Sequence, residues 1–432
     1  ALDHITSHHQ VVLDPSCGSG VFLVEAYKRL VLHWRLRHQW RRPDKHVLQS
    51  LLAFVHGVDL EEDAVELAGF SLCLAMCDAL QPAQIRRSIK LFPNLRQQTL
   101  HHGCFFAAKE AGQLPARIGA VLGNPPFVSA LQTPAAQRAY ARYQTEHDKK
   151  LPDKQAGYLF LHEASEIMDD GATISMLQQY NFLYNQNALA FRQQYLARYW
   201  VREILDFVSV RGLFQKGDAD TKVVVVVAQK RVRPDHATLL HATFRRTGRI
   251  DAEQGLDLDY YDLHVVPYRV AQTNDRLWRA NLLGGGRALS LVNRLEQMRT
   301  LRQYAEQQGW DVGEGFIVGN SDQRKHAPHL TGHPYLPSKA LTTSGIDESQ
   351  IEPLADELFY RAYTERRFTP PMLLVREQMQ LAHAVWEGHY LTYSQQMVGF
   401  CAPQEDLPKL NAIDLWMSAE KRTLRAYLAL TS

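Results

Sequence analysis

The stretch Gln10-Val-Val-Leu-Asp-Pro-Ser-Cys-Gly-Ser-Gly-Val-Phe-Leu23 decides the fold of this chain. Its first part, Gln10–Asp14, is rich in β-forming side chains and predicts a short strand that ends in a glycine turn. Apolar residues then recur at helical spacing over Val21–Trp40, which predicts a helix directly after the turn. A strand, a glycine turn and a helix in this order indicate the start of a parallel α/β sheet.

The alternation of strand and helix patterns continues to about residue 230. Further strands are expected over Phe54–Leu60, Gln98–Gly103, Ile118–Gly123, Ala172–Leu177, Val201–Val208 and Lys222–Gln229, and helices over Glu61–Leu80, Gly157–Asp169 and Asn187–Tyr199. This alternation predicts a mostly parallel sheet covered on both faces. The last two strands have no helix between them, so we expect them to pair as an antiparallel hairpin at the sheet edge.

The second half of the chain has a different pattern. After about residue 232 the alternation fades, and Gly284-Gly285-Gly286 marks a flexible break. We therefore expect two domains: residues 1–235 form the sheet domain, and residues 236–432 form an irregular α+β domain. A length of 432 residues is typical of two or three domains.

The composition is that of a globular protein, with 45% hydrophobic and 22% charged residues. The longest aliphatic run, Val223–Ala228, is too short to cross a bilayer, and no leader peptide opens the chain, so we expect no membrane partner and a cytoplasmic location. A net charge of +2 neither indicates nor excludes a nucleic-acid partner, because a basic groove can lie in a neutral chain. The first expected strand begins within about ten residues of the start, which suggests a piece of a longer protein.

The five cysteines have no framework spacing, which favours reduced thiols. Cys73 and Cys77 lie four residues apart on an expected helix, but no second Cys or His pair accompanies them. A structural zinc site needs about four ligands, so we expect core thiols and no metal.

The glycine turn after the first strand predicts a ligand site. Gly18 and Gly20 allow a sharp turn and a close approach to a ligand, and the helix that follows offers free N–H groups. Asp59 ends the second expected strand, where a carboxylate can bind the two hydroxyls of a ribose. No Gly-Lys-Ser/Thr follows, so this is no phosphate loop. A nucleoside with an amino-acid tail fits these features better.

Asp14-Pro-Ser-Cys-Gly-Ser-Gly-Val-Phe-Leu23 resembles the cofactor motif of the gamma-class DNA adenine-N6 methyltransferases. These are the methylases of type I and type IIG restriction–modification systems and their phage-defence relatives. The resemblance implies S-adenosylmethionine as cofactor and a Rossmann-like class I methyltransferase fold. The cofactor residues that it implies are Asp14, Cys17, Gly18 and Gly20 at the methionine end, Phe22 in the pocket wall, Asp59 at the ribose, and Leu60 near the adenine ring.

A second motif, Asn124-Pro125-Pro126-Phe127, follows the fourth expected strand, where this family holds the base to be methylated. The exocyclic amine of adenine is a poor nucleophile. The Asn124 side-chain oxygen and the Pro125 carbonyl can both accept hydrogen bonds from it, and the two prolines fix the backbone. The base must leave the duplex, and Phe127 offers an aromatic face for it.

The resemblance extends to two further positions and departs from the family pattern at a third, Cys104. Phe214, in the loop before the last strand, matches an aromatic residue that covers the other face of the base. Gly157-Tyr-Leu-Phe160 resembles the helix motif that closes the cofactor pocket. Cys104 stands where relatives have an acidic or Asn residue for the cofactor's adenine amine, and a thiol is a weaker acceptor. A family segment upstream of the glycine motif is missing here.

Residues 236–432 stand where this family has its target-recognition domain, and we expect that domain to be incomplete here. Trp310–Asn320, Phe368–Val375 and Gly388–Tyr393 resemble parts of it. Arg324, Lys325, Arg366 and Arg367 are candidate phosphate contacts. The implied partners are double-stranded DNA and a fused or separate nuclease, helicase or specificity subunit.

The sequence therefore predicts a site-specific DNA methyltransferase that transfers a methyl group from S-adenosylmethionine to N6 of a flipped-out adenine. It would serve a restriction–modification or phage-defence system. Two alternatives stay open. A protein-glutamine methyltransferase also uses Asn-Pro-Pro-aromatic, although those enzymes lack a large second domain. A degenerate methylase acting as a DNA-binding specificity subunit is favoured by Cys104 and the missing upstream segment.

Overall fold

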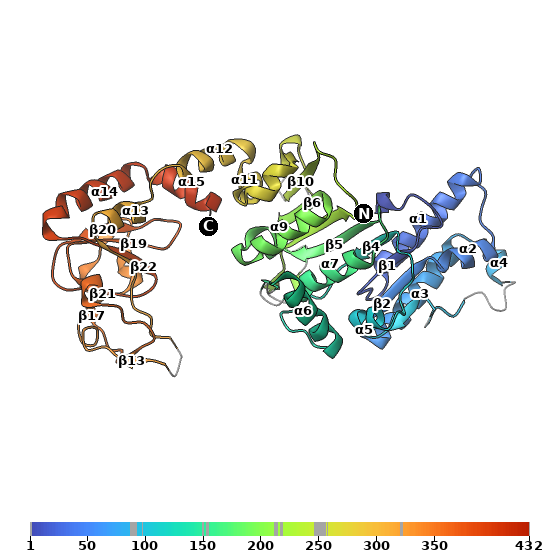
Figure 1. Cartoon of the computed structure of the whole chain (residues 1–432), viewed down its shortest axis with the longest axis horizontal. Helices are drawn as coiled ribbons and strands as arrows, with labels where there is room; N and C mark the ends of the chain where they lie inside the picture. The colour runs from blue at the N-terminus through green and yellow to red at the C-terminus, as the bar shows by residue number, and fades with distance from the viewer. Residues whose placement is uncertain are drawn as a thin grey trace. The chain divides into compact units, whose positions relative to one another are not determined.

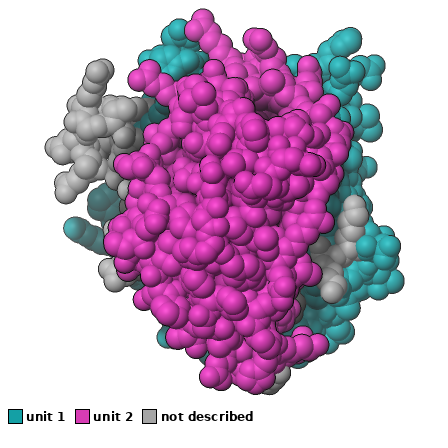
Figure 2. Space-filling view, turned by 90° about the vertical axis from the view of Figure 1, so that its left-hand side faces the viewer, with its two compact units in different colours: residues 1–285 teal, residues 286–432 magenta. Residues whose placement is uncertain are grey.

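The computed structural model describes residues 2–86, 93–96, 98–148, 151–152, 155–210, 215–216, 219–245, 256, 258–319 and 323–431. Figure 1 labels the helices and strands along the chain. The chain divides into two compact units, residues 1–285 and residues 286–432, which Figure 2 colours separately. No helix of the described part combines the length and the apolar character that a membrane crossing requires.

One large sheet organises unit 1. Within the described residues its order is β11-β10-β6-β9-β5-β4-β1-β2-β3. Its strands are β1 (Val12–Asp14), β2 (Val55–Asp59), β3 (Leu100–His102), β4 (Ala120–Gly123), β5 (Thr173–Gln179), β6 (Trp200–Ser209), β9 (Val223–Gln229), β10 (Thr238–Arg245) and β11 (Leu263–Pro267). All neighbours are parallel except that β9 runs antiparallel to β5 and β6, and β11 antiparallel to β10. Every residue of β1 and β4 is buried, which is typical of a sheet covered on both faces.

Helices connect these strands and supply the core of unit 1 (Figure 1). They are α1 (Val21–Arg37), α2 (Lys45–Leu52), α3 (Glu62–Asp78), α4 (Pro82–Arg86), α5 (Phe105–Glu110), α6 (Pro134–His147), α7 (Ala156–Ile167), α8 (Asn181–Tyr184), α9 (Leu189–Arg198), α10 (Tyr268–Thr273) and α11 (Arg276–Leu283). Tyr27 and Leu30 of α1 pack with Leu72 of α3 and Leu48 of α2 in one apolar cluster against the sheet. Burial of such side chains is the main force that holds these helices in place.

The expected strands and helices between residues 10 and 230 are confirmed, with ends that differ by a few residues. The antiparallel pairing of β6 with β9 is confirmed as well. The sheet then continues past this pair, because β10 adds parallel to the free side of β6 and β11 adds to β10. Helices α2, α4, α5, α6 and α8 were not expected.

The boundary between the units lies later than the sequence predicted. The expected division at residues 235/236 would separate β10 and β11 from the sheet with which they pair, and the observed division falls at Gly285/Gly286. The polar residues His241 and Thr243 interrupt the apolar pattern that would predict a buried strand at β10, yet both side chains are fully buried. They have tertiary partners: His241 Nε2 lies 3.3 Å from Asp206 Oδ2, and Thr243 Oγ1 donates to the Asp262 carbonyl at 3.4 Å.

Unit 2 is an irregular α+β unit, as expected for this part of the chain. Its main sheet has the order β12-β22-β19-β20 and is antiparallel throughout. These strands are β12 (Asp311–Glu314), β19 (Met372–Arg376), β20 (His383–Trp386) and β22 (Met397–Cys401), and the helices are α12 (Gly285–Glu296), α13 (Leu301–Gln307), α14 (Leu407–Ala419) and α15 (Lys421–Thr431). The remaining strands of unit 2 are short: β13 (Lys325–His326), β14 (Pro334–Leu336), β15 (Leu341–Thr342), β16 (Gly345–Ile346), β17 (Glu352–Pro353), β18 (Leu358–Phe359) and β21 (Thr392–Tyr393). Unit 1 also has a short strand pair, β7 (Gln215–Lys216) and β8 (Ala219–Asp220).

Candidate functional site

The two sequence motifs leave the sheet at adjacent strands. β1 pairs in parallel with β4, so that Val12 lies beside Ala120, and β1 also pairs with β2, where Asp14 lies beside Gly57. The chain order along the sheet reverses between β1 and β4, and ligands bind outside the carboxyl ends of strands at such a reversal. The glycine loop and Asn124 therefore start at the same edge of the sheet.

Gly20 fixes the path of the glycine loop. It has a φ of 81° and forms the N-cap of α1, and its N–H donates to the Cys17 carbonyl at 2.8 Å. A Cβ on Gly20 would lie 2.9 Å from both Cα and Cβ of Ala68 on α3. Gly18 also has a left-handed backbone, with a φ of 51°. Only glycine satisfies both the backbone angle and the close packing at position 20.

Asp59, at the end of β2, is bound directly to the glycine loop. Its Oδ2 accepts the Gly18 N–H at 2.8 Å, and its Oδ1 accepts the Glu61 N–H at 3.0 Å. Two carboxylate oxygens have about four acceptor sites, so this half-buried group retains capacity for a ligand's hydroxyls.

The side chains of Asp14 and Cys17, at the start of the glycine loop, are both buried. The Asp14 side chain is buried, and its Oδ1 accepts the Ser16 N–H at 3.0 Å. Burial, with a smaller contribution from the nearby Asp59, raises the pKa of the Asp14 carboxyl to about 7, against the lowering effect of the Ser16 hydrogen bond. Burial likewise raises the pKa of the Cys17 thiol, which is typical of an inert structural cysteine.

A cavity of about 380 Å³ opens at this edge of the sheet. Its walls come from the glycine loop, the ends of β2 and β3, the Asn-Pro-Pro segment and the first turns of α6 and α7. They comprise Pro15, Ser16, Gly18, Asp59, Leu60, Glu61, Gly103, Cys104, Phe105, Phe106, Asn124, Pro126, Val128, Ala130, Leu131, Gln132, Thr133, Ala136, Ala156 and Phe160. Both predicted sites thus contribute to one cavity, and its volume lies in the range of ordinary ligand pockets.

Three phenylalanines form an aromatic wall of the cavity. The rings of Phe105 and Phe160 are stacked with centroids 5.5 Å apart, and the rings of Phe106 and Phe160 meet edge to face at 4.8 Å. Phe160 belongs to the helix motif expected to close the cofactor pocket. Phe105 and Phe106 were not predicted, although an aromatic pair directly after a strand's terminal glycine was the available signal. This wall offers an apolar surface of the kind that a purine ring requires.

The Asn-Pro-Pro-Phe segment presents two of its four side chains to the cavity. Asn124 and Pro126 line it and are exposed, and Asn124 forms no side-chain hydrogen bond with any described residue. Pro125 is buried and Phe127 is half-buried, and neither is among the lining residues. The fixed prolines therefore hold a free amide at the cavity.

Cys104 lies in the cavity wall next to the start of α6. Its Sγ is 3.0 Å from Oγ1 of Thr133, and the same oxygen caps α6 by accepting the Ala136 N–H at 3.2 Å. The thiol thus links the end of β3 to α6. Thr133 and Ala136 were not predicted as site residues, because nothing in their local sequence shows that α6 begins beside β3.

The remaining predicted residues differ in their placement. Leu60 lines the cavity and is 46% exposed. Phe22 is half-buried against the core cluster of α1 to α3 and is not a lining residue. Phe214 lies outside the described residues.

Two of the four candidate phosphate contacts are engaged within unit 2. Arg367 forms an ion pair with Asp311 and donates from Nη1 to the Glu314 carbonyl at 3.0 Å, and Arg366 donates to the Gly309 carbonyl. Arg367 is therefore committed to contacts within unit 2. Arg366 is exposed and makes one backbone contact, so its phosphate role stays a prediction. Arg324 and Lys325 are exposed.

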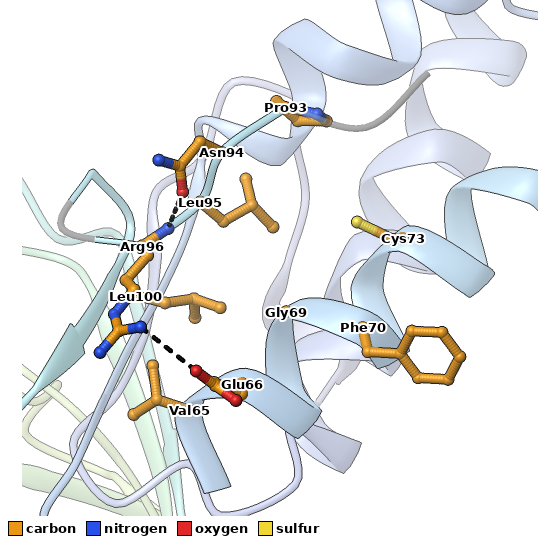
Figure 3. Close-up of a pocket in the computed structure, with 10 residues that line it drawn as sticks. All are labelled: Val65, Glu66, Gly69, Phe70, Cys73, Pro93, Asn94, Leu95, Arg96 and Leu100. Atoms are coloured by element: carbon orange, nitrogen blue, oxygen red, sulfur yellow. Dashed lines mark hydrogen bonds and ion pairs between the residues drawn. The ribbon is translucent and has the colours of Figure 1, made fainter. Parts of the chain in front are cut away.

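A second cavity lies beside α3, away from both motifs (Figure 3). It has a volume of about 190 Å³ and is lined mainly by apolar side chains of α3 and of the segment before β3. Arg96 and Glu66 form an ion pair across it at 3.2 Å, and the Asn94 side chain accepts the Arg96 N–H at 3.1 Å. Its polar groups bond to one another, in contrast to the free amide of Asn124.

Part of the sequence and the fold resemble known proteins. Residues 54–214 match the family described as Eco57I restriction-modification methylase. A stretch of 88 residues is 32% identical to a putative type II restriction enzyme and methyltransferase of Methanocaldococcus jannaschii, over 19% of this chain and 8% of that protein.

Solved structures with the same fold include two restriction–modification enzymes. The type IIL enzyme MmeI in complex with DNA has a TM-score of 0.56 at 12% identity, over 92% of this chain and 57% of its own. The ATP-dependent type ISP enzyme LlaBIII bound to DNA has a TM-score of 0.50 at 11% identity, over 91% of this chain and 31% of its own. The chain thus spans less than two thirds of each of these relatives.

The sheet order, the loop after β1 and these likenesses establish the fold class, and S-adenosylmethionine is the cofactor expected for it. The chain therefore carries, over residues 54–214, a domain that matches the Eco57I restriction-modification methylase family, within a unit that has the class I S-adenosylmethionine-dependent methyltransferase fold.

Proposed function

We propose that this chain is the methyltransferase part of a site-specific DNA-modifying enzyme. It transfers a methyl group from S-adenosylmethionine to N6 of an adenine that has left the duplex, and unit 2 contributes to target recognition. The enzyme belongs to a restriction–modification or phage-defence system.

One observation carries this proposal: the free amide of Asn124 lines the same cavity as Asp59 and Gly18. Asp59 and Gly18 are suited to a nucleoside, and Asn124 is suited to an amine. A single cavity with both features can hold the methyl donor and the amine that accepts the methyl group side by side. Such proximity accounts for a large part of catalysis in group transfer.

The residues of the cavity fit the cofactor. The Asp59 carboxylate is available for the ribose hydroxyls, and the Phe105–Phe106–Phe160 wall offers an apolar surface for the adenine. Asp14 lies beneath the loop as a buried acid with a raised pKa, and a cationic ligand nearby would stabilise its charged form. When bound, the cofactor supplies an electrophilic methyl group on a sulfonium.

The protein's task is to make the acceptor amine a better nucleophile. The Asn124 side-chain oxygen and the Pro125 carbonyl would accept the two N–H bonds of the amine, which directs its lone pair away from the ring. Buried Pro125 fixes this geometry in advance, so little reorganisation is needed at the moment of reaction.

The flipped base also needs an aromatic surface to replace its lost stacking. Phe127 follows the acceptor residues directly and is half-buried, and it lies outside the lining of the cavity, so its ring would have to turn towards the base on binding. A base–aromatic stack contributes about 1–3 kcal/mol.

Duplex DNA is the proposed partner. Two structures with the same fold, MmeI and LlaBIII, contain DNA. In unit 2, the exposed cations Arg324 and Lys325 are suited to phosphates. Because the chain spans only part of these relatives, we place any nuclease, helicase or specificity subunit outside it.

The test is a methylation assay with isotope-labelled S-adenosylmethionine and genomic DNA, followed by mass spectrometry of the nucleosides. We expect N6-methyladenine, and we expect Asn124→Ala to lower turnover on the order of 10²–10³-fold while the cofactor Kd stays within about twofold. Asn94→Ala, at an exposed site in the other cavity, should keep full turnover.

The alternatives give different results. Label in cytosine would contradict the adenine assignment, and label on a glutamine of an added protein would favour the protein methyltransferase. Cofactor and DNA binding without transfer would favour a specificity subunit.

A further inference from the structure

Three side chains with metal-binding atoms meet at the far end of α6, outside the cavity described above. Glu146 and His147 end α6, and His162 lies in the middle of α7. One ligand atom from each of the three lies within 4.8 Å of those of the other two. A single ion can therefore contact all three after small side-chain adjustments.

His147 has one ring nitrogen engaged and one free. Its Nδ1 is hydrogen-bonded to the Gln194 side-chain amide, while its buried Nε2 has no hydrogen-bond partner among the described residues. The two ends of a glutamine amide are assigned from their surroundings. Here Gln194 Nε2 faces Nδ1, and Gln194 Oε1 accepts from the Tyr143 hydroxyl at 3.3 Å. Rotating the amide by 180° exchanges both contacts, because the hydroxyl can also accept; Nδ1–H then donates to the amide oxygen and Nε2 carries a lone pair. This is the arrangement of metal-bound histidines, whose second nitrogen is held by another group.

His162 faces the same space. Its side chain is 93% buried, and it forms no hydrogen bond with any described residue. The His147 and His162 rings lie with centroids 5.3 Å apart and nearly perpendicular, at 86°. Both histidines line a gap of about 10 Å³, close to the volume of one water-sized occupant, whereas Glu146 lies outside its lining and joins the two histidines through its carboxylate oxygen.

The positive charges around this gap are already paired. Arg198, which lines it, bonds to Glu166 at 2.7 Å, and Arg142 on α6 bonds to Glu110 at 2.8 Å. No described cation is bonded to Glu146. The carboxylate of Glu146 is exposed and available to an ion entering from solvent.

We propose that Glu146, His147 and His162 bind one divalent transition-metal ion, of which Zn²⁺ is the best fit. Two imidazoles and one carboxylate form a ligand set that zinc uses in proteins, with water in the fourth position. Mg²⁺ and Ca²⁺ prefer a shell of oxygens, and the two histidines disfavour them.

The ion would join the two helices that form one side of the cofactor cavity. Thr133 and Ala136 at the start of α6 line that cavity, as do Ala156 and Phe160 at the start of α7. A metal bridge from the end of α6 to the middle of α7 would hold these walls together. This bridge does not depend on the identity of the methyl acceptor, and with three protein ligands it leaves the fourth position of the ion to water.

The test is metal titration of the full 432-residue chain after treatment with a chelator and dialysis. We expect calorimetry to show one Zn²⁺ per chain, a rise in Tm with Zn²⁺ but not with Mg²⁺, and visible absorption typical of tetrahedral Co²⁺ when Co²⁺ replaces it. Glu146→Gln changes an exposed side chain and should weaken Zn²⁺ binding tenfold or more, on the order of what even outer partners contribute.

Matched variants separate this site from other histidines. His147→Gln and His162→Gln should lose the site, and the exposed His46→Gln on α2 should keep it, with circular dichroism as a check on folding. Because His162 is buried, the two α6 variants decide the matter if His162→Gln does not fold. The absence of saturable Zn²⁺ binding, or binding that Glu146→Gln and His147→Gln leave unchanged, would overturn the proposal.

Discussion

Replacement of Asp59 by alanine tests the nucleoside half of the cavity. The Asp59 carboxylate lines the cavity, and its oxygens accept the Gly18 N–H at 2.8 Å and the Glu61 N–H at 3.0 Å. Hydrogen bonds from ribose hydroxyls to this charged group contribute about 1–3 kcal/mol. Asp59→Ala should therefore weaken S-adenosylmethionine binding roughly 5- to 150-fold, since 1.4 kcal/mol corresponds to about tenfold.

The same substitution also leaves two loop N–H groups without their acceptor. Gly18 is half-buried and Glu61 is exposed, so water can replace most of what they lose, and we expect only a small fall in Tm. Asp59→Asn retains an oxygen for the Gly18 N–H and should have a Tm near that of the wild type, with a Kd between those of wild type and Asp59→Ala.

The assay is calorimetric titration at fixed pH and salt, with Tm measured on the same samples. The matched control is Asp63→Ala, which removes an exposed carboxylate from the first turn of α3, outside the cavity. An unchanged Kd in a folded Asp59→Ala protein would refute the reasoning. Equal weakening by Asp63→Ala would show that only the general negative charge of this region matters.

Three further outcomes are expected. Gly20→Ala should lower the unfolding free energy by about 1–2 kcal/mol because of the left-handed backbone, and by about 1–3 kcal/mol more because the new Cβ contacts Ala68. The control is Gly112→Ala, where φ is 66° and the space around the residue is open, so that denaturant unfolding should show only the backbone effect. Burial raises the pKa of Asp14 from 3.8 to about 7, so between these pH values the folded protein holds a proton that the unfolded chain has lost. The unfolding free energy should therefore fall as the pH rises from about 4 to 7 and level off above 7, as denaturant unfolding at several pH values would show. A cationic cofactor favours the ionised form, so its affinity should rise up to about tenfold per pH unit towards pH 7 and then level off; calorimetry should find a flat profile for Asp14→Asn. Phe160→Ala should lower the unfolding free energy by about 3–5 kcal/mol in denaturant unfolding, as for other large core truncations, and should weaken cofactor binding.

The positions of the two motifs at one edge of the sheet could be predicted because they follow from local patterns. The left-handed turn at Gly20 needs glycine wherever it occurs, and the prolines that follow Asn124 restrict the backbone after β4. The order of strands and helices up to β9 followed from local periodicity as well.

The rest depends on contacts between distant segments. The strand β10 contains His241 and Thr243, which are buried only because Asp206 and the Asp262 carbonyl bond to them. The placement of Thr133 beside Cys104, and of His147 beside His162, depends in the same way on how α6 packs. Such pairs leave no pattern in the sequence.

The central claim is that the cofactor and the acceptor residues share one cavity. A crystal structure of the chain with S-adenosylhomocysteine tests it most directly. We expect the ribose at Asp59, the adenine against the Phe160 wall, and the sulfur facing Asn124. A ligand bound elsewhere, or one separated from Asn124 by protein side chains, would contradict the claim.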